Sequence, residues 1–281
     1  LDEAGYRVIA IDNRGHGMSD KTYDADVYHP WIMAEDAVAL LDHLGIPEAH
    51  VMGYSMGARV STFMAITHPD RVRSLVLGGL GIGMVEGVGD WDPIADALLA
   101  PSLDDVMHLR GRMFRVFAEQ TRSDRQALAA CIQGSRDLAA KEDVARIEAP
   151  TLIAGGTKDD IAGSAQELAD LMPHAEVVDI PNRDHMLAVG DKVFKTAVLE
   201  FYKRLENCRA GSVKYPAGEM RFPSRGKGGP PFGIVGAVES LGADHFRFAQ
   251  QIAILFDDGA DCEFRGMQRD RRIGGDRMGE G

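Results

Sequence analysis

The chain contains few cysteines, fewer basic than acidic residues, and no long apolar run. Its 3 cysteines, Cys131, Cys208 and Cys262, include no Cys-x-x-Cys pair, so we expect neither a disulfide framework nor a zinc site. Such sparse cysteines are typical of a reducing compartment, and we expect the protein in the cytoplasm. A net charge of -12 disfavours nucleic acid as a partner, because phosphate-binding surfaces need clustered Lys and Arg. No stretch approaches the roughly 20 apolar residues of a membrane helix, so no membrane partner is expected. We therefore expect a globular enzyme that acts on a small or neutral molecule.

Apolar residues are abundant enough for a large core, and they recur in alternating strand and helix patterns. They make up 45% of the 281 positions, which suits one α/β domain with an inserted cap. Short strand-like runs alternate with stretches of helical spacing, which predicts an α/β fold with a mostly parallel sheet and helices on both faces. The predicted strands are Tyr6–Asp12, His50–Tyr54, Val72–Leu77, Pro150–Ala154 and Ala175–Ile180, and the predicted helices are Trp31–Leu44, Met56–Thr67, Ser164–Leu171 and Gly190–Leu205.

The segment between the two groups of strands has helical patterns and no convincing strand. We interpret residues 79–147 as a helical cap inserted between two parts of a core, residues 1–78 and 148–206. The glycine-rich run at 78–83 is interpreted as a mobile connection, because it holds no Gly-x-Gly-x-x-Gly match and no Lys-Ser/Thr follows it. The helical patterns in the cap cover Asp104–Gln120 and Asp124–Leu138.

The last part of the chain, residues 207–281, has a different composition. Residues 208–281 hold 14 of the 32 glycines, and their net charge is +1 where the rest of the chain carries -13. No steady periodicity would let this segment bury one face, so we expect disorder or a foreign tail. The apolar patch Phe246–Phe256 is the exception, for which a short helix is expected.

The pentapeptide Gly53-Tyr54-Ser55-Met56-Gly57 lies between a predicted strand and a predicted helix. A serine at such a tight turn requires small residues two positions before and after it, and glycine stands at both. The turn would lift the Ser55 hydroxyl above the sheet edge and leave the Met56 N–H at a helix N-terminus, where it can bind a developing oxyanion. We predict Ser55 as a nucleophile, with a merely structural turn as the alternative.

A serine hydroxyl needs a base to remove its proton, and the base needs a carboxylate to orient it. His185 is the predicted base, because it follows the last predicted core strand and precedes the final helix. His174 lies at the wrong end of that strand, and His245 lies in the unusual tail. The competing interpretation is that His185 is an ordinary solvated loop histidine.

The acid is expected in the loop that follows the strand Pro150–Ala154. Asp159 is the predicted acid, because it stands three residues after Gly156, a spacing that presents the carboxylate toward the histidine. Asp160 remains the alternative, and two solvated turn aspartates are the interpretation without chemistry.

Four blocks occur in a fixed order within residues 1 to about 206: Asp12–Asp20, Gly53–Gly57, Gly156–Asp159 and Asp184–Met186. Together they resemble the α/β-hydrolase superfamily, specifically the small-capped group of esterases, lactonases and perhydrolase-type enzymes. The resemblance implies the α/β-hydrolase fold, with Ser55 as nucleophile, Asp159 as acid and His185 as general base. It gives the first block a mostly architectural role, so His16 is not predicted to be catalytic.

One departure from the family concerns the start of the chain. The first residue is Leu1 rather than Met, and Leu1–Gly5 is typical of a helix end with a glycine cap. Family members begin with further strands, and a loop after one of them supplies the second oxyanion donor. We therefore expect an N-terminally truncated core in which Met56 is the remaining donor.

The predicted reaction is hydrolysis of a carboxylic ester, lactone or thioester through an acyl-enzyme, with a small acyl substrate and no metal or organic cofactor. A carbon-carbon bond hydrolase or a cofactor-free perhydrolase would use the same three residues and stays open. A non-catalytic or inactive fragment of such an enzyme is the alternative from another class. The oligomeric state does not follow from the sequence.

Overall fold

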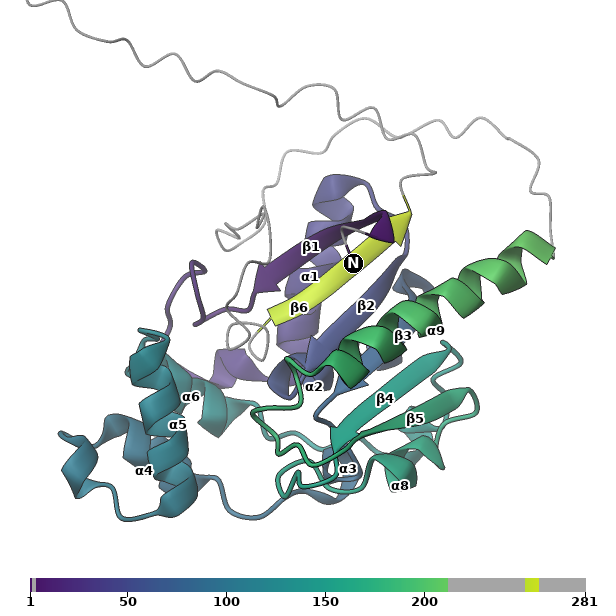
Figure 1. Cartoon of the computed structure of the whole chain (residues 1–281). Helices are drawn as coiled ribbons and strands as arrows, with labels where there is room; N and C mark the ends of the chain where they lie inside the picture. Colours follow the sequence, from purple (N-terminus) through teal and green to yellow (C-terminus); the bar gives the residue numbers. More distant parts are fainter. Residues whose placement is uncertain (2–3, 212–250, 258–281) are drawn as a thin grey trace, which may run out of the picture.

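The computed structural model describes residues 1, 4–211 and 251–257. Its centre is a six-stranded sheet in the order β1-β6-β2-β3-β4-β5, with helices packed against both faces (Figure 1). The mixed, mostly parallel sheet confirms the predicted fold class. The strands are β1 (Tyr6–Asp12), β2 (Ala49–Tyr54), β3 (Val72–Gly78), β4 (Thr151–Gly156), β5 (Ala175–Ile180) and β6 (Gln251–Asp257).

The helices connect the strands and also form a separate group beside the sheet. Within the described part of the chain, none of them has the length and apolarity that crossing a membrane requires. The helices are η2 (Ala25–Tyr28), α1 (Pro30–Leu44), α2 (Met56–Thr67), η3 (Pro69–Arg71), α3 (Gly83–Glu86), α4 (Asp92–Leu99), η4 (Leu103–Asp105), α5 (Leu109–Gln120), α6 (Arg125–Gly134), α7 (Lys141–Val144), α8 (Ala165–Ala169) and α9 (Lys192–Gly211).

The strands β2, β3, β4 and β5 form the parallel part of the sheet. In their register Gly53 pairs with Leu77, Leu77 with Ile153, and Ile153 with Val177. All six residues of β2 are buried, as expected for a parallel strand covered on both faces. The carboxyl ends of these strands meet at one edge, so the loops that follow β2, β4 and β5 lie close together.

Alternation along the strands divides the core between two faces. Val51 belongs to the apolar cluster that includes residues of α1, α2 and α8, whereas Met52, the next residue, belongs to the cluster that includes residues of α9. This follows from the period of two in a strand, in which successive side chains point to opposite faces. Each face of the sheet therefore has its own apolar cluster and its own helical cover.

The strand β6 corrects the expected short helix at Phe246–Phe256. It lies between β1 and β2 and is antiparallel to both, with Ile254 opposite Ile9 and Ala253 opposite Met52. Ile252 and Ile254 join one apolar cluster, and Ala253 joins the other. The apolar run is a strand because its backbone pairs with a strand on each side and its side chains enter the apolar clusters on both faces of the sheet. The remainder of the expected tail, residues 212–250 and 258–281, lies outside the described residues.

Residues 79–147 contain helices and no strand, and all of these residues are described. The helices α4, α5 and α6 lie together to one side of the sheet (Figure 1) and share a small apolar cluster that includes Leu98 and Leu128. The helix predicted to begin at Asp104 begins at Leu109, because Ser102 caps the separate turn η4 and His108 caps α5. The assignment of this segment as a cap stays a prediction.

Candidate active site

Ser55 stands at the turn between β2 and α2, in a strained backbone conformation. Its φ is 52° and its ψ is -111°, a region that residues with a side chain rarely occupy. The turn is so tight that a Cβ added at Gly53 would lie 2.2 Å from the carbonyl carbon of Gly57. The Ser55 N–H donates to the carbonyl of Gly78 at 2.8 Å, which ties the turn to the end of β3. The sequence therefore has glycine where this geometry demands it.

The structure brings Ser55, His185 and Asp159 into one chain of hydrogen bonds. His185 Nε2 lies 2.8 Å from Ser55 Oγ, and His185 Nδ1 lies 2.8 Å from Asp159 Oδ2. A carboxylate can only accept, so Nδ1 carries a proton and Nε2 is left to accept the serine hydroxyl. His185 is 4% exposed, so the bonds are shielded from water. The arrangement can transfer a proton from the hydroxyl to the imidazole.

Asp159 is held as a carboxylate by more than the histidine. Its Oδ1 accepts the backbone N–H of Ile161 at 2.9 Å and that of Ala162 at 3.0 Å. Burial, the largest single influence, raises the pKa of Asp159, but the hydrogen bond and charge of His185 together with these two N–H groups outweigh it, and the pKa is lowered. Asp160 is 82% exposed at its side chain and lies 3.7 Å from Arg110, away from His185.

The loops that carry the acid and the histidine are fastened to each other. The Lys158 N–H donates to the carbonyl of Arg183 at 2.9 Å, and a Cβ added at Gly156 would lie 2.2 Å from that same oxygen. The buried hydroxyl of Tyr54 donates to the carbonyl of His185 at 2.6 Å. These bonds fix the position of the imidazole relative to β2, on which the serine turn is built.

Met56 begins α2, and its side chain lines the cavity in front of Ser55. As the first residue of a helix, it has a backbone N–H without an intrahelical partner. The site can therefore offer a donor next to the serine. His16, which was not predicted to be catalytic, also lines the cavity, and its Nδ1 lies 2.8 Å from the carbonyl of Arg14. Burial is the main reason why the pKa of His16 is lowered.

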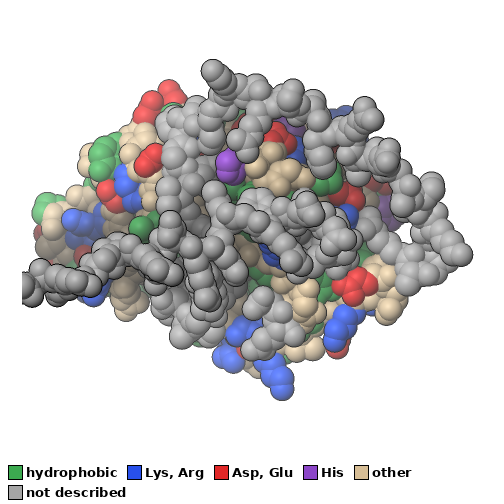
Figure 2. Space-filling view, turned by 90° about the horizontal axis from the view of Figure 1, so that it is seen from above, with side chains coloured by type: hydrophobic (Ala, Val, Ile, Leu, Met, Phe, Trp, Pro, Cys, Tyr) green, Lys and Arg blue, Asp and Glu red, His purple; other side chains and the backbone are tan. Residues whose placement is uncertain are grey.

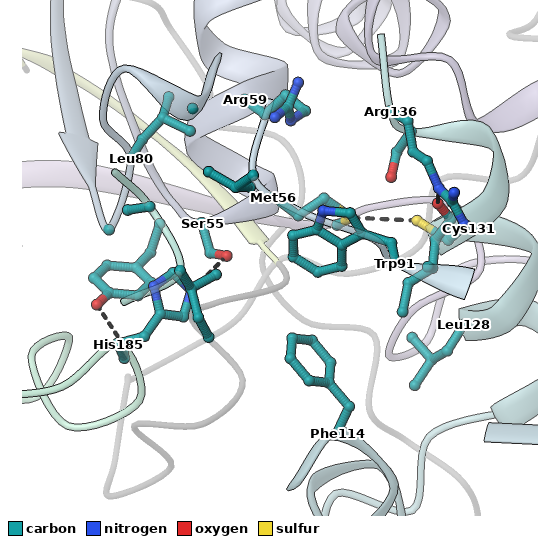
Figure 3. A pocket seen from close by; sticks show the side chains of 18 of the residues that line it. Ser55, Met56, Arg59, Leu80, Trp91, Phe114, Leu128, Cys131, Arg136 and His185 are labelled. Carbon is teal, nitrogen blue, oxygen red and sulfur yellow. Dashed lines mark hydrogen bonds between the residues drawn. The ribbon is translucent and has the colours of Figure 1, made fainter. Parts of the chain in front are cut away.

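A cavity of about 380 Å³ opens in front of the serine (Figure 3). Ser55 and His185 lie on one side of it in that view, and Leu128 and Arg136 lie on the other, with Trp91 between them. Most of the wall is apolar and comes from residues 79–147. The lining includes Leu80, Val88, Trp91, Leu98, Phe114, Phe117, Leu128, Cys131, Ile132 and Leu138.

Sequence reasoning missed Arg59 and Arg136, which line the same cavity. Arg59 had a signal that could have found it, because it stands four residues after Ser55, in the predicted helix that begins at Met56. Arg136 had none, since its position depends on how the helices of 79–147 pack.

Comparisons with known proteins agree with this fold. The family described as alpha/beta hydrolase fold matches residues 1–107. The putative non-heme bromoperoxidase BpoC of Mycobacterium tuberculosis is 28% identical over 223 residues, which cover 71% of this chain and 84% of that protein. The putative carbamate hydrolase RutD of Variovorax paradoxus is 46% identical over 77 residues, 27% of this chain and 29% of that protein. The enol-lactonase of Burkholderia xenovorans has a TM-score of 0.54 at 22% identity, over 68% of this chain and 80% of that one, a likeness of fold.

A serine turn between a parallel strand and a helix, with its acid and histidine after later strands, defines the α/β-hydrolase class of fold. The fold and the family match over residues 1–107 agree in indicating this class. The family and the named relatives indicate a hydrolase.

Proposed function

We propose that this protein is a serine hydrolase that cleaves a carboxylic ester, lactone or thioester through an acyl-enzyme. The observation that carries the proposal is the chain of hydrogen bonds from Asp159 through His185 to Ser55, at a strained turn facing an apolar cavity. Strain at a backbone position is typical of functional sites, because a merely structural turn gains nothing from it.

In the proposed reaction the Ser55 oxygen attacks the carbonyl carbon, and its proton moves to Nε2 of His185. The Met56 N–H donates to the oxyanion that forms. The tetrahedral intermediate collapses, and His185 gives the proton to the leaving alcohol or thiol. A water molecule then attacks the acyl-enzyme, with His185 as its base, and releases the acid and the serine. Asp159 holds the imidazole and stabilises its charged form throughout, and the cycle needs no metal or organic cofactor.

The remaining parts of the proposal concern the substrate and its surroundings. The apolar wall from residues 79–147 suits the carbon chain of an acyl group, so this segment would act as the cap over the site. The 3 widely spaced cysteines suit the reducing conditions of the cytoplasm.

The test is covalent labelling with a fluorophosphonate, which requires an activated serine but no matched substrate. We expect one label on Ser55, identified by peptide mass spectrometry, and none in Ser55→Ala. Ser135→Ala is the matched control, because Ser135 lines the same cavity without belonging to the hydrogen-bonded chain. A label on another residue would refute the nucleophile. Absence of both labelling and ester hydrolysis would favour the non-catalytic alternative.

A carbon-carbon bond hydrolase or a perhydrolase would pass the labelling test, since both use an activated serine in this family. Product analysis separates them from an esterase. An esterase converts an aryl ester and water into an acid and a phenol, and it needs no hydrogen peroxide. A perhydrolase forms a peracid when hydrogen peroxide is added, and the similarity to a protein named as a bromoperoxidase makes that assay worthwhile.

A further inference from the structure

The arginines of this protein differ in whether a carboxylate neutralises them. Arg14 binds the carboxylate of Asp36 at 2.7 Å, and Arg115 binds that of Glu119 at 2.6 Å. Both side chains are largely buried, and a buried guanidinium is costly without such a partner. Acidic and basic side chains both occur on the part of the face that Figure 2 leaves uncovered.

Arg59 and the partly buried Arg125 have only backbone carbonyls as hydrogen-bond partners among the described residues, and of the two only Arg59 lines the cavity. Within the described part of the chain, the one hydrogen bond of Arg59 runs from Nη1 to the backbone carbonyl of Asp137 at 2.6 Å. The Asp137 carboxylate is engaged elsewhere, with Oδ2 2.7 Å from Nδ1 of His29. Burial lowers the pKa of Arg59 to about 10, although the charge of Asp137 opposes this. Most of the donors of this guanidinium therefore have no partner among the described residues and can meet a ligand.

The cavity collects positive charge within an acidic protein. Among the described residues that line it, two are arginines, Arg59 and Arg136, and none is Asp or Glu. Arg136 is partly neutralised, because its Nη2 lies 2.8 Å from Asp92, whose side chain is 71% exposed. The net charge of the chain is -12, so this concentration of positive charge runs against its composition.

The position of Arg59 also costs stability. It lies in the first turn of α2, where the helix dipole disfavours a positive charge. Burial and the single neutral partner add to that cost. A structural residue at this place would be better served by an uncharged side chain, so an arginine there indicates a ligand of opposite charge.

We propose that Arg59, assisted by Arg136, binds a carboxylate of the substrate, so that the enzyme acts on acyl esters or lactones with a second, free carboxylate remote from the scissile bond. The proposal rests on the proposed function for its reaction. Of the small or neutral substrates expected from composition, it selects small ones that carry a negative charge. Arg59 stands four residues after Ser55, roughly 6 Å along the helix at 1.5 Å per residue. The free carboxylate and the reacting carbonyl would therefore be joined by a short chain lying along the apolar wall.

The experiment compares two esters that differ in one charge: p-nitrophenyl hydrogen adipate and its methyl-capped form, p-nitrophenyl methyl adipate. We expect a higher kcat/KM for the charged ester in the wild type. Arg59→Met should lower the ratio of the two kcat/KM values by roughly 10- to 100-fold, mainly through KM, the size expected for a hydrogen-bonded charge pair. Arg59→Lys keeps the charge and should restore part of the ratio.

Arg112→Gln is the matched control. Arg112 is exposed and donates to the carbonyl of Leu103 at 2.6 Å, so it too has a backbone oxygen as partner, but it does not line the cavity. Its removal should leave the ratio unchanged. An equal kcat/KM for both esters in wild type and Arg59→Met would overturn the carboxylate site and leave the serine hydrolase standing.

A binding measurement keeps the inference testable if no ester is cleaved. Free adipate should raise the Tm of Ser55→Ala, and the shift should disappear when Arg59→Met is added. If adipate raises the Tm of Ser55→Ala but the wild type cleaves no ester, the carboxylate site is upheld and the proposed function fails. No shift at millimolar adipate, with both variants folded by circular dichroism, would overturn the site.

Discussion

The two sides of the cavity differ in how many hydrogen-bond partners their polar side chains have. On the catalytic side, defined by Ser55, His185 and Asp159, each polar side-chain atom of the chain has a partner at 2.8 to 3.0 Å. On the arginine side, defined by Arg59 and Arg136, Arg59 donates to one backbone oxygen within the described part of the chain. Its neighbour Arg136 pairs with the largely exposed carboxylate of Asp92.

The difference separates groups that must stay fixed from groups that must wait for a ligand. A proton moves between Ser55 and His185 only if the imidazole keeps one orientation, and a complete set of bonds secures that orientation. A guanidinium that already had a carboxylate would have little affinity left for a second one. We therefore interpret polar side chains with all their hydrogen bonds made as catalytic, and a charged side chain with few partners as one that binds the substrate.

The largest expected effect comes from removing the nucleophile. Ser55→Ala deletes the atom that attacks, so kcat for any ester substrate should fall by at least about 10⁴-fold. The measurement is steady-state hydrolysis of an activated aryl ester. Retention of activity within a few-fold of wild type would mean that the catalytic side does not carry the reaction.

The next effect tests which aspartate belongs to the catalytic side. Asp159→Asn replaces the acceptor of the imidazole N–H, disturbs the tautomer of His185, and should lower kcat about 10³- to 10⁴-fold. Asp160→Asn is the control one residue away, with an exposed side chain that pairs with Arg110. It should leave kcat unchanged. The reverse pattern would assign the acid to Asp160.

Local patterns were sufficient for the parts of the fold that repeat over short distances. The strands Tyr6–Asp12 and Ala175–Ile180 and the helix Met56–Thr67 have the bounds that the sequence predicted. In each case apolar periodicity and a nearby glycine or proline mark the ends. The three residues singled out for chemistry are also those that the structure places in one hydrogen-bonded chain, because glycine positions and strand order constrain such loops strongly.

The same patterns failed where partners lie far apart in the sequence. The run at Phe246–Phe256 was expected to be helical, and its strand β6 is specified by pairing with β1 and β2, about 200 residues or more away. Arg59 could not be assigned to a cavity either, since residues 79–147 form most of the wall. Neither fact is encoded by neighbours in sequence, so only tertiary packing reveals it.

A smaller effect on stability follows from the lowered pKa of Asp159. Its pKa in the folded state lies below the unfolded value of about 3.9, so the carboxylate favours folding above that pH, and this contribution is lost as the pH falls through the folded pKa. The difference in unfolding free energy between wild type and Asp159→Asn should therefore be largest near neutral pH and shrink in acid. Urea unfolding at several pH values measures it, and a difference independent of pH would contradict the linkage.

The smallest expected effect concerns the support of the imidazole. Tyr54→Phe removes the hydroxyl that donates to the carbonyl of His185 at 2.6 Å, which leaves a buried oxygen unpaired and should cost about 1–3 kcal/mol of stability. Tyr28→Phe is the matched control, because Tyr28 is also buried and donates to the carbonyl of Thr22 at 2.7 Å. Both variants should lose similar Tm, but only Tyr54→Phe should lower kcat, by a few-fold, since its carbonyl partner belongs to the catalytic histidine. Equal kcat in the two variants would show that the catalytic side keeps its geometry without this bond.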